Sequence, residues 1–223
     1  MKFKNKELLI FDFDGTLINS IPDLTSAVNK MLANYGLTPL TIEDVTPFIG
    51  NGAKALVEKA LASATKNKAN SEISLEEALK VYFSAYKEIT CEETFLYSGV
   101  LETLEYLKQK GYKMAISTNK PFNFIEPILD KLEIKEFFKI WIGEDSLPKK
   151  KPDAAPILYL ADKYKIELDK CIMIGDSKND ILAAHNSGID SIGVSYGYNY
   201  NEDISNYKPT LVIDHFEDMQ ELF

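Results

Sequence analysis

The chain has 223 residues, enough for one large domain or two modest ones, and its 45% hydrophobic and 26% charged composition is that of an ordinary globular protein. Acidic residues outnumber basic ones 34 to 25, and the formal net charge of −9 argues against general binding to nucleic acid or to an anionic membrane. An anionic substrate therefore needs local positive charge, or a cation, to approach this protein.

Cysteine usage and the N-terminal segment indicate a compartment. The two cysteines, Cys91 and Cys171, are unclustered, which fits a reducing environment and gives no zinc site or disulfide framework. The first residues, MKFKNKELLIFDFDG, contain a short apolar run that aspartates interrupt, so they predict neither a signal peptide nor a transmembrane helix. We expect a cytoplasmic protein that does not bind membranes.

The first predicted element is a buried strand over residues 7–11, a short apolar run that Asp and Gly residues close. From Ser20 onward, apolar residues recur every three or four positions, which predicts a helix with Ser20 as N-cap and its end near Gly36. A second helical pattern covers residues 53–64. A third begins at Ser74, where the sequence SLEE matches a capping box.

Further along the chain, predicted strands and helices alternate. The strands cover residues 112–117, 171–174, 191–194 and 211–213, with a less well-defined strand near 140–143. The helices cover residues 100–110, 122–132, 154–164 and 179–186. This alternation is typical of βαβ units, so we expect an α/β fold with a Rossmann-like parallel sheet flanked by helices.

The segment between Asp14 and Tyr112 is far longer than a crossover needs and is mostly helical in pattern. We therefore predict that residues 18–85 form a helical cap domain. The cap would be inserted into an α/β core domain made of residues 1–17 and 86–223.

Polar clusters follow the predicted strands, and four of them belong at one edge of the sheet: DFDGT (12–16), STNK (117–120), KKKP (149–152) and GDSKND (175–180). Taken singly, each has a structural explanation, namely a turn after a strand, a capped helix start, a solvated lysine run or an N-capped turn. In open α/β sheets, however, ligands bind outside the carboxyl ends of the strands. The four clusters together therefore predict a binding or catalytic site.

In this order the four clusters resemble the four motifs of the haloacid dehalogenase superfamily, and the resemblance covers essentially the whole core. The cap resembles that of one subgroup, the phosphoglycolate phosphatases. The matching stretches are INSIPDL (18–24), FIGNGA (48–53) and YGY (196–198), although Asn19 departs from the aspartate often found at its position.

The resemblance assigns catalytic roles that the chemistry supports. Asp12 would be the nucleophile that forms an aspartyl-phosphate, and Asp14 would act as general acid and base. Mg²⁺ would be bound by Asp12, the backbone carbonyl of Asp14 and the side chain of Asp176, because this ion prefers oxygen ligands. Asp180 would lie beside these ligands and orient water or Lys151.

Phosphate binding is expected from the second and third motifs. Thr118 and Asn119 would hold phosphate oxygens, and Lys151 would supply positive charge to both Asp12 and the phosphate. Lys151 is preferred over the two preceding lysines because it stands before Pro152, which restricts its backbone to extended conformations. Lys149 and Lys150 are expected to be solvated.

The turn after the first strand and one cap loop complete the predicted substrate site. Gly15 and Thr16 would shape the phosphate-binding loop after Asp14. In the cap, Gly50, Asn51 and Gly52 would bring backbone donors to the substrate carboxylate, with Lys54 adding charge. Alternatively, residues 50–52 only connect two helices. The cap aromatic residues Tyr82, Phe83 and Tyr86 are expected to pack within the cap.

These features favour a Mg²⁺-dependent phosphatase that acts on a small phosphate monoester, with 2-phosphoglycolate as the leading candidate. Alternatives on the same machinery are a nucleotidase, a pyrophosphatase or a phosphomutase. A non-catalytic phosphate-binding module is a further alternative, against which the presence of Asp12, Asp14 and Lys151 argues. Dehalogenation does not call for Asp14. The sequence leaves open whether the protein is a monomer or a homodimer.

Overall fold

The structure is a computed structural model and describes residues 2–65 and 73–223. Its centre is a six-stranded parallel sheet, in which β1 pairs with β4 on one side and with β6 on the other. In sheet order the strands are β5 (Ile140–Ile142), β4 (Lys113–Ser117), β1 (Leu8–Phe11), β6 (Cys171–Gly175), β7 (Asp190–Val194) and β8 (Leu211–Ile213).

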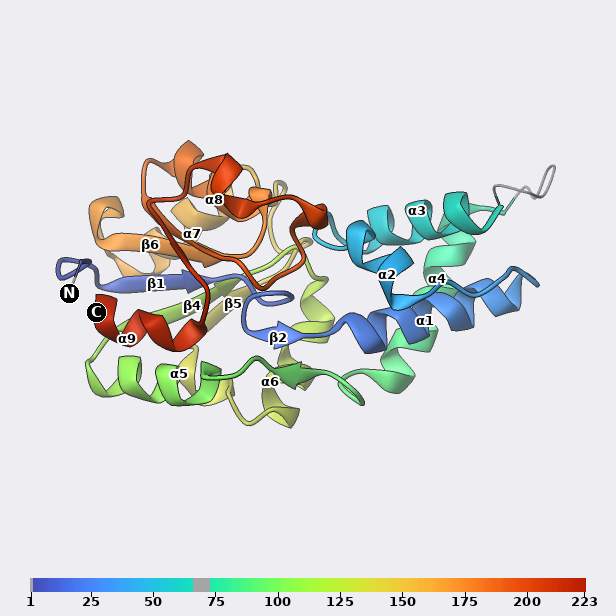
Figure 1. The fold of residues 1–223 in the computed structure, drawn as a ribbon, viewed down its shortest axis with the longest axis horizontal. Coiled ribbons are helices and arrows are strands. Elements are labelled where there is room, and N and C mark those ends of the chain that lie inside the picture. Colours follow the sequence, from blue (N-terminus) through green and yellow to red (C-terminus); the bar gives the residue numbers. More distant parts are fainter. Residues whose placement is uncertain (1, 66–72) are drawn as a thin grey trace.

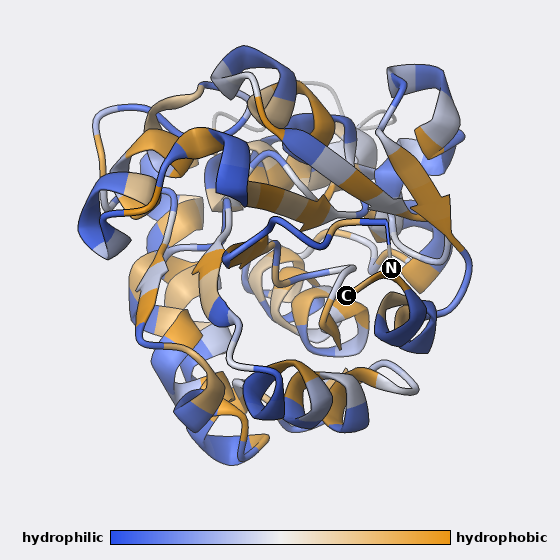
Figure 2. Cartoon of the chain, turned by 90° about the vertical axis from the view of Figure 1, so that its left-hand side faces the viewer, coloured by the Kyte–Doolittle hydropathy of each residue, from blue (hydrophilic) through white to orange (hydrophobic). Residues whose placement is uncertain are grey.

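Both faces of this sheet are covered by helices (Figure 1). One face carries α7 (Ala155–Tyr164) and α8 (Lys178–Ser187), and the other carries α5 (Val100–Gln109), α6 (Ile125–Lys131) and α9 (Met219–Leu222). Successive strand residues point to opposite faces, so all four residues of β1 are apolar and fully buried. Figure 2 shows apolar residues concentrated on the strands, with hydrophilic ones on the outer helices.

A second layer of helices lies beyond one end of the sheet, on the right in Figure 1. It contains α1 (Ile21–Asn34), α2 (Ile42–Val45), the short 3₁₀ helix η1 (Thr46–Phe48), α3 (Ala53–Thr65) and α4 (Leu75–Ile89). Their apolar faces bury a core of their own, distinct from the two cores on either side of the sheet. These helices therefore form the cap over the sheet edge.

Two chain crossings connect the cap to the sheet, and they run side by side. The short strands β2 (Ile18–Asn19) and β3 (Phe95–Leu96) pair antiparallel as a two-stranded ribbon. Beside the ribbon, the buried carboxylate of Asp23 accepts hydrogen bonds from the backbone N–H and the hydroxyl of Thr94. This contact ties the first turn of α1 to the returning chain.

The predicted α/β fold is confirmed, and most predicted elements lie within a few residues of the observed ones. Ser20 and Ser74 are the N-cap residues of α1 and α4, as predicted, but neither side chain makes a capping hydrogen bond. The capping box predicted at Ser74 is therefore wrong, and the hydroxyl of Ser20 donates to Asp14. Helix α4 continues through position 85 to Ile89, and the division of the chain into domains stays a prediction.

The remaining elements are short 3₁₀ helices in the connections between strands. They cover Phe122–Phe124, Lys135–Phe137, Leu168–Lys170, Asn199–Asn201, Ile204–Tyr207 and Phe216–Asp218. Of the helices in residues 2–65 and 73–223, none has both the length and the apolar character that crossing a lipid bilayer requires.

Candidate active site

The site begins at the carboxyl end of β1, where the chain turns sharply. Gly15 adopts φ +86°, a left-handed conformation that suits glycine, and the turn brings the backbone N–H groups of Leu17 and Ile18 to the carbonyl of Phe13. Asp12 and Asp14 flank Phe13 and both line the same pocket. The sequence DFDGT therefore presents two carboxylates from a single loop.

Three carboxylates gather beside this turn: Asp12, Asp176 after β6 and Asp180 in α8 have oxygen atoms within 4.8 Å of one another. Burial, and then repulsion by Asp180, raise the pKa of Asp176 to about 7. Burial and the charges of Asp180 and Asp176 likewise raise the pKa of Asp12 well above its ordinary value, although Lys151 opposes this. The negative charges of this cluster are therefore only partly neutralised by Lys151.

Lys151 bridges two members of this cluster. Its ammonium lies 3.0 Å from Asp12 Oδ1 and 2.5 Å from Asp180 Oδ1, and its side chain is buried. Burial alone would lower the pKa of Lys151, but the two carboxylates reverse this and raise it above its ordinary value. The backbone N–H and hydroxyl of Ser177 donate to the second oxygen of Asp180. Asp180 therefore positions Lys151 against Asp12.

Asp176 is held in a close-fitting surround. Its carboxylate accepts hydrogen bonds from the Thr16 hydroxyl at 3.0 Å and from the Tyr198 backbone N–H at 2.7 Å. A Cβ atom at Gly197 would lie 2.5 Å from Asp176 Cγ, and one at Gly15 would lie 2.7 Å from it. Gly15 and Thr16, predicted at the phosphate loop, thus shape the surroundings of Asp176.

Asp14 has two partners that the sequence did not predict. Ser20 Oγ donates to Asp14 Oδ1 at 2.6 Å, and Lys120 Nζ lies 3.0 Å from the same oxygen and 3.2 Å from Oδ2. Lys120 is the last residue of the STNK cluster, and its buried ammonium also lies 4.9 Å from the centre of the Tyr86 ring. A cap aromatic residue and a core carboxylate therefore share one lysine.

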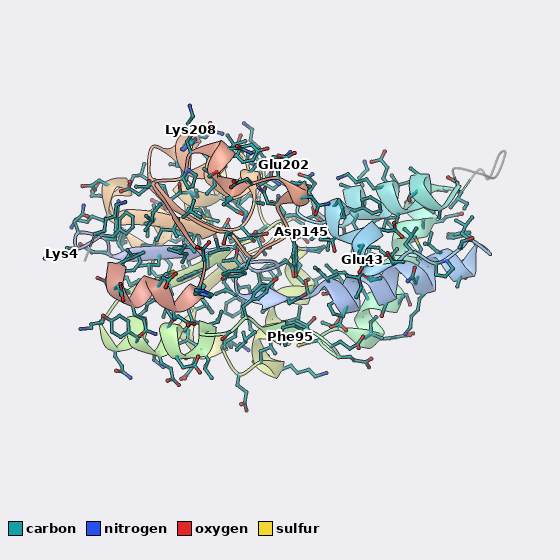
Figure 3. All side chains as sticks on the ribbon, in the orientation of Figure 1. Lys4, Glu43, Phe95, Asp145, Glu202 and Lys208 are labelled. Atoms are coloured by element: carbon teal, nitrogen blue, oxygen red, sulfur yellow. The ribbon has the colours of Figure 1, made fainter. Side chains whose placement is uncertain are left out.

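A pocket of about 50 Å³ lies between the core and the cap. Its core side includes the two aspartates that follow β1, together with Thr118, Asn119 and Lys120, and its cap side includes Gly50 and Gly52. The predicted cap-packing residues pack together, and they also line the pocket: Tyr82, Phe83 and Tyr86. Figure 3 shows Asp145 at the junction of core and cap, with Phe95 of β3 below it.

The cap loop at residues 50–52 contacts the core through its carbonyl groups. The Gly50 carbonyl accepts hydrogen bonds from the side-chain amides of Asn119 (2.9 Å) and Asn179 (3.0 Å), and Asn51 Oδ1 also accepts from Asn179. The Asn51 carbonyl accepts from Lys150, which also pairs with Glu144. We name this set of bonds the latch.

The latch changes two sequence-based predictions. Lys150 is not free in solvent but spans the core and the cap, whereas Lys149 is exposed as predicted. Lys54 is exposed and lies outside the pocket lining. The lysine that does line the pocket is Lys120, and only its position in the STNK cluster after a strand could have identified it.

Comparisons with known proteins identify the family of this chain. The family model of the haloacid dehalogenase-like hydrolases matches residues 9–194. A phosphoglycolate phosphatase of Colwellia psychrerythraea is 44% identical over 98% of this chain and 97% of its own length. One from Psychrobacter arcticus is 43% identical over 95% of this chain and 93% of its own length.

Solved structures show the same architecture. The crystal structure of a predicted phosphoglycolate phosphatase from Haemophilus somnus superposes with a TM-score of 0.94 at 39% identity, covering 98% of both chains. That of a similar protein from Lactobacillus delbrueckii gives a TM-score of 0.84 at 28% identity over 99% of this chain and 98% of its own. The match thus includes both the core motifs and the cap, and the chain belongs to the haloacid dehalogenase-like hydrolases.

Proposed function

We propose that the protein is a Mg²⁺-dependent phosphatase that hydrolyses 2-phosphoglycolate to glycolate and phosphate. The observation that carries the proposal is that Asp12 and Asp14 line a pocket whose opposite side is formed by the cap. Relatives that are 43–44% identical and are named phosphoglycolate phosphatase support both the reaction class, hydrolysis of a phosphoric monoester, and this substrate.

In the first step, a carboxylate oxygen of Asp12 attacks phosphorus. An oxygen–phosphorus bond to Asp12 forms, the bond from phosphorus to the glycolate oxygen breaks, and Asp14 gives its proton to that oxygen. Lys151 and the backbone N–H of Phe13, 2.7 Å away, fix the orientation of the Asp12 carboxylate. Thr118 and Asn119, which line the pocket, would hold phosphate oxygens.

In the second step, water replaces the enzyme's carboxylate on phosphorus. Asp14, now ionised, accepts a proton from the water, whose oxygen attacks phosphorus while the bond to Asp12 breaks. Ser20 and Lys120 hold Asp14 in place during both steps. Because the cap forms one side of the pocket, it would control whether water or an alcohol reaches the aspartyl-phosphate.

The aspartate cluster fits a hard divalent cation. Its donors are oxygen atoms, which Mg²⁺ prefers, and the raised pKa values of Asp12 and Asp176 reflect burial and then repulsion between carboxylates, both of which a bound cation would offset. Asp12, Asp176 and the backbone carbonyl of Asp14 would hold the ion, with Asp180 engaged by Lys151. When bound, Mg²⁺ neutralises the phosphate charge and polarises the phosphoryl group.

The test is phosphate release with Mg²⁺ from 2-phosphoglycolate, pyrophosphate, nucleoside monophosphates and hexose phosphates. We expect kcat/KM for 2-phosphoglycolate to exceed that for each other compound by at least about 100-fold, and EDTA to abolish release. Acid-quenched samples analysed by mass spectrometry should carry phosphate on Asp12. The Asp12→Asn protein is the blank.

Other outcomes select among the alternatives. Preference for another compound would keep the mechanism and reject the substrate, and transfer of the phosphoryl group to a sugar would indicate a mutase. A folded protein that binds Mg²⁺ but releases phosphate from none of these compounds would reject the enzyme proposal in favour of a binding module.

A further inference from the structure

The pocket contains a buried cation, Lys120, whose only role in the two catalytic steps is to hold Asp14. The side chain of Lys120 is only 2% exposed, and among the described residues that line the pocket it is the only one with a cationic side chain. Lys151 lies behind Asp12, where Asp12 and Asp180 compensate its charge. Lys120 is therefore the positive charge that a bound substrate would meet.

The ammonium of Lys120 has a donor to spare. In the described part of the chain, its only hydrogen-bond acceptors are the two carboxylate oxygens of Asp14, while an ammonium carries three N–H groups. Its other neighbour is the ring face of Tyr86, which offers cation–π attraction but no carboxylate or carbonyl. A further anionic acceptor could bind here without displacing Asp14.

The surrounding wall makes such an acceptor selective. Near Lys120 the pocket is lined by Tyr82, Tyr86 and Phe124, whose rings pack against one another. Among these ring faces a charge pair is stronger than in water, so a carboxylate gains more by meeting Lys120 here than it would in solvent. An uncharged leaving group would contact the rings but would leave the third donor unused.

The residues that would hold the phosphate and Lys120 line the same pocket, which favours a short ester. Thr118 and Asn119 lie on the core side of the pocket together with Lys120. The part of a two-carbon acid phosphate beyond its ester oxygen has four non-hydrogen atoms, two of them carboxylate oxygens. The anionic group of such an ester therefore stays within the pocket that holds its phosphate.

We propose that Lys120 binds the carboxylate of the substrate and thereby selects short phosphate esters that carry an acid group two carbons from the phosphate oxygen. This inference rests on the proposed function, whose substrate it explains at the level of one residue. It assigns to Lys120, in the core, the binding of the substrate carboxylate, a role that the sequence suggested for Lys54 and for residues 50–52 of the cap.

The test compares two substrates and two variants. Wild-type, Lys120→Met and Lys120→Arg proteins are assayed with 2-phosphoglycolate and with ethyl phosphate, which lacks the carboxylate. We expect Lys120→Met to lower the ratio of the two kcat/KM values by at least about 30-fold, and Lys120→Arg to restore part of it because the charge is kept. The matched control is Lys87→Met on α4, an exposed lysine outside the pocket lining, which should leave both activities unchanged.

A binding measurement separates recognition from positioning of Asp14. Calorimetry with 3-phosphonopropionate, a non-hydrolysable mimic of 2-phosphoglycolate, and with propylphosphonate requires no proton transfer. The preference for the first compound should shrink in Lys120→Met by the same factor as the kinetic ratio. If Lys120→Met does not fold, Lys120→Arg and the wild-type preference between these ligands still decide the question.

Two failures are distinguishable. If the wild type prefers 2-phosphoglycolate but Lys120→Met weakens both substrates equally, Lys120 only holds Asp14, and this inference is wrong while the proposed function stands. If the wild type turns over ethyl phosphate as well as 2-phosphoglycolate, the proposed substrate itself is wrong.

Discussion

Asp12 combines a catalytic requirement with an energetic cost. Its pKa is raised well above the ordinary value, chiefly by burial and then by Asp180, so folding favours its protonated form. Without metal, Asp12 therefore opposes folding at any pH above the ordinary carboxyl range. Ionising the nucleophile is thus costly until a cation binds beside it.

Asp12→Asn should separate activity from stability. We expect phosphate release to fall by at least about 10⁴-fold because the amide cannot form the phosphorylated intermediate. In EDTA at pH 8, the thermal midpoint should equal or exceed that of the wild type, since a neutral group replaces the costly charge. A midpoint several degrees lower would mean that the attraction between Asp12 and Lys151 outweighs burial and repulsion.

Asp180 has the opposite role, because it compensates a buried lysine. Asp180→Ala leaves Lys151 with Asp12 alone and removes the acceptor of Ser177, so we expect a loss of about 3–5 kcal/mol in the free energy of unfolding, measured in urea. The control is Glu76→Gln, which breaks an exposed pair with Lys80 and should leave the urea midpoint unchanged. Equal midpoints for both variants would contradict this assignment.

At the scale of elements, the sequence predicted those parts that depend on local patterns. Strand β1 could be predicted because a strand between two layers of helices is apolar on both faces, which leaves a continuous apolar run in the sequence. Helix α1 could be predicted because its apolar residues recur on one face. The ribbon of β2 and β3 was missed because each strand has two residues, too few to show a period.

Contacts across long sequence separations could not be predicted in the same way. Even over six positions, the pattern that placed Ser20 at the start of a helix did not show that its hydroxyl donates to Asp14. The pairing of Lys120 with Asp14 joins residues 106 positions apart, and the capture of Gly50 by Asn179 joins residues 129 apart. The motifs placed these residues at one edge without specifying their partners.

The loop that contains Gly197 is expected to control metal binding through packing. In Gly197→Ala the new methyl group would press on Asp176, so we expect Mg²⁺ affinity to fall by about 10-fold or more, measured by calorimetry. Gly111→Ala makes the same chemical change at φ +84° with no heavy atom within 4 Å. That control should lower stability and leave Mg²⁺ affinity intact. If Gly197→Ala binds Mg²⁺ as tightly as the control, the packing has no such role.

The latch should govern closure of the cap. Asn179→Ala removes amide bonds to Gly50 and Asn51, so we expect KM for 2-phosphoglycolate to rise about 10-fold and amide exchange in residues 49–57 to accelerate. Asn186→Ala, on the same helix, removes an exposed amide bond to Pro152 and serves as the control. An unchanged KM with unchanged exchange would show that closure does not depend on Asn179.

At the scale of the whole molecule, pH and Mg²⁺ should act together on stability. The pKa of Asp176 is raised to about 7, so the metal-free protein loses stability as pH rises from the ordinary carboxyl range to about 7 and changes little through this group above it. Because Mg²⁺ must displace the proton, the rise in thermal midpoint on adding it should grow up to about pH 7 and then level off. Thermal melts with and without Mg²⁺ from pH 5 to 9 measure this. A larger Mg²⁺ effect at pH 5 than at pH 8 would contradict the proposed ligands.

The paired ribbon has a consequence for engineering. Because Ile18 pairs with Leu96 and Asn19 with Phe95, the segment between them leaves and re-enters the core at points only about 5 Å apart. Adjacent ends are the geometry that inserted modules need. Residues 20–94 can therefore be exchanged as one cassette for the corresponding segment of a relative, with both splice points inside the ribbon. Such chimaeras would keep the aspartates of the core and take the cap side of the pocket from another enzyme. This offers a route to new substrates without altering the chemistry.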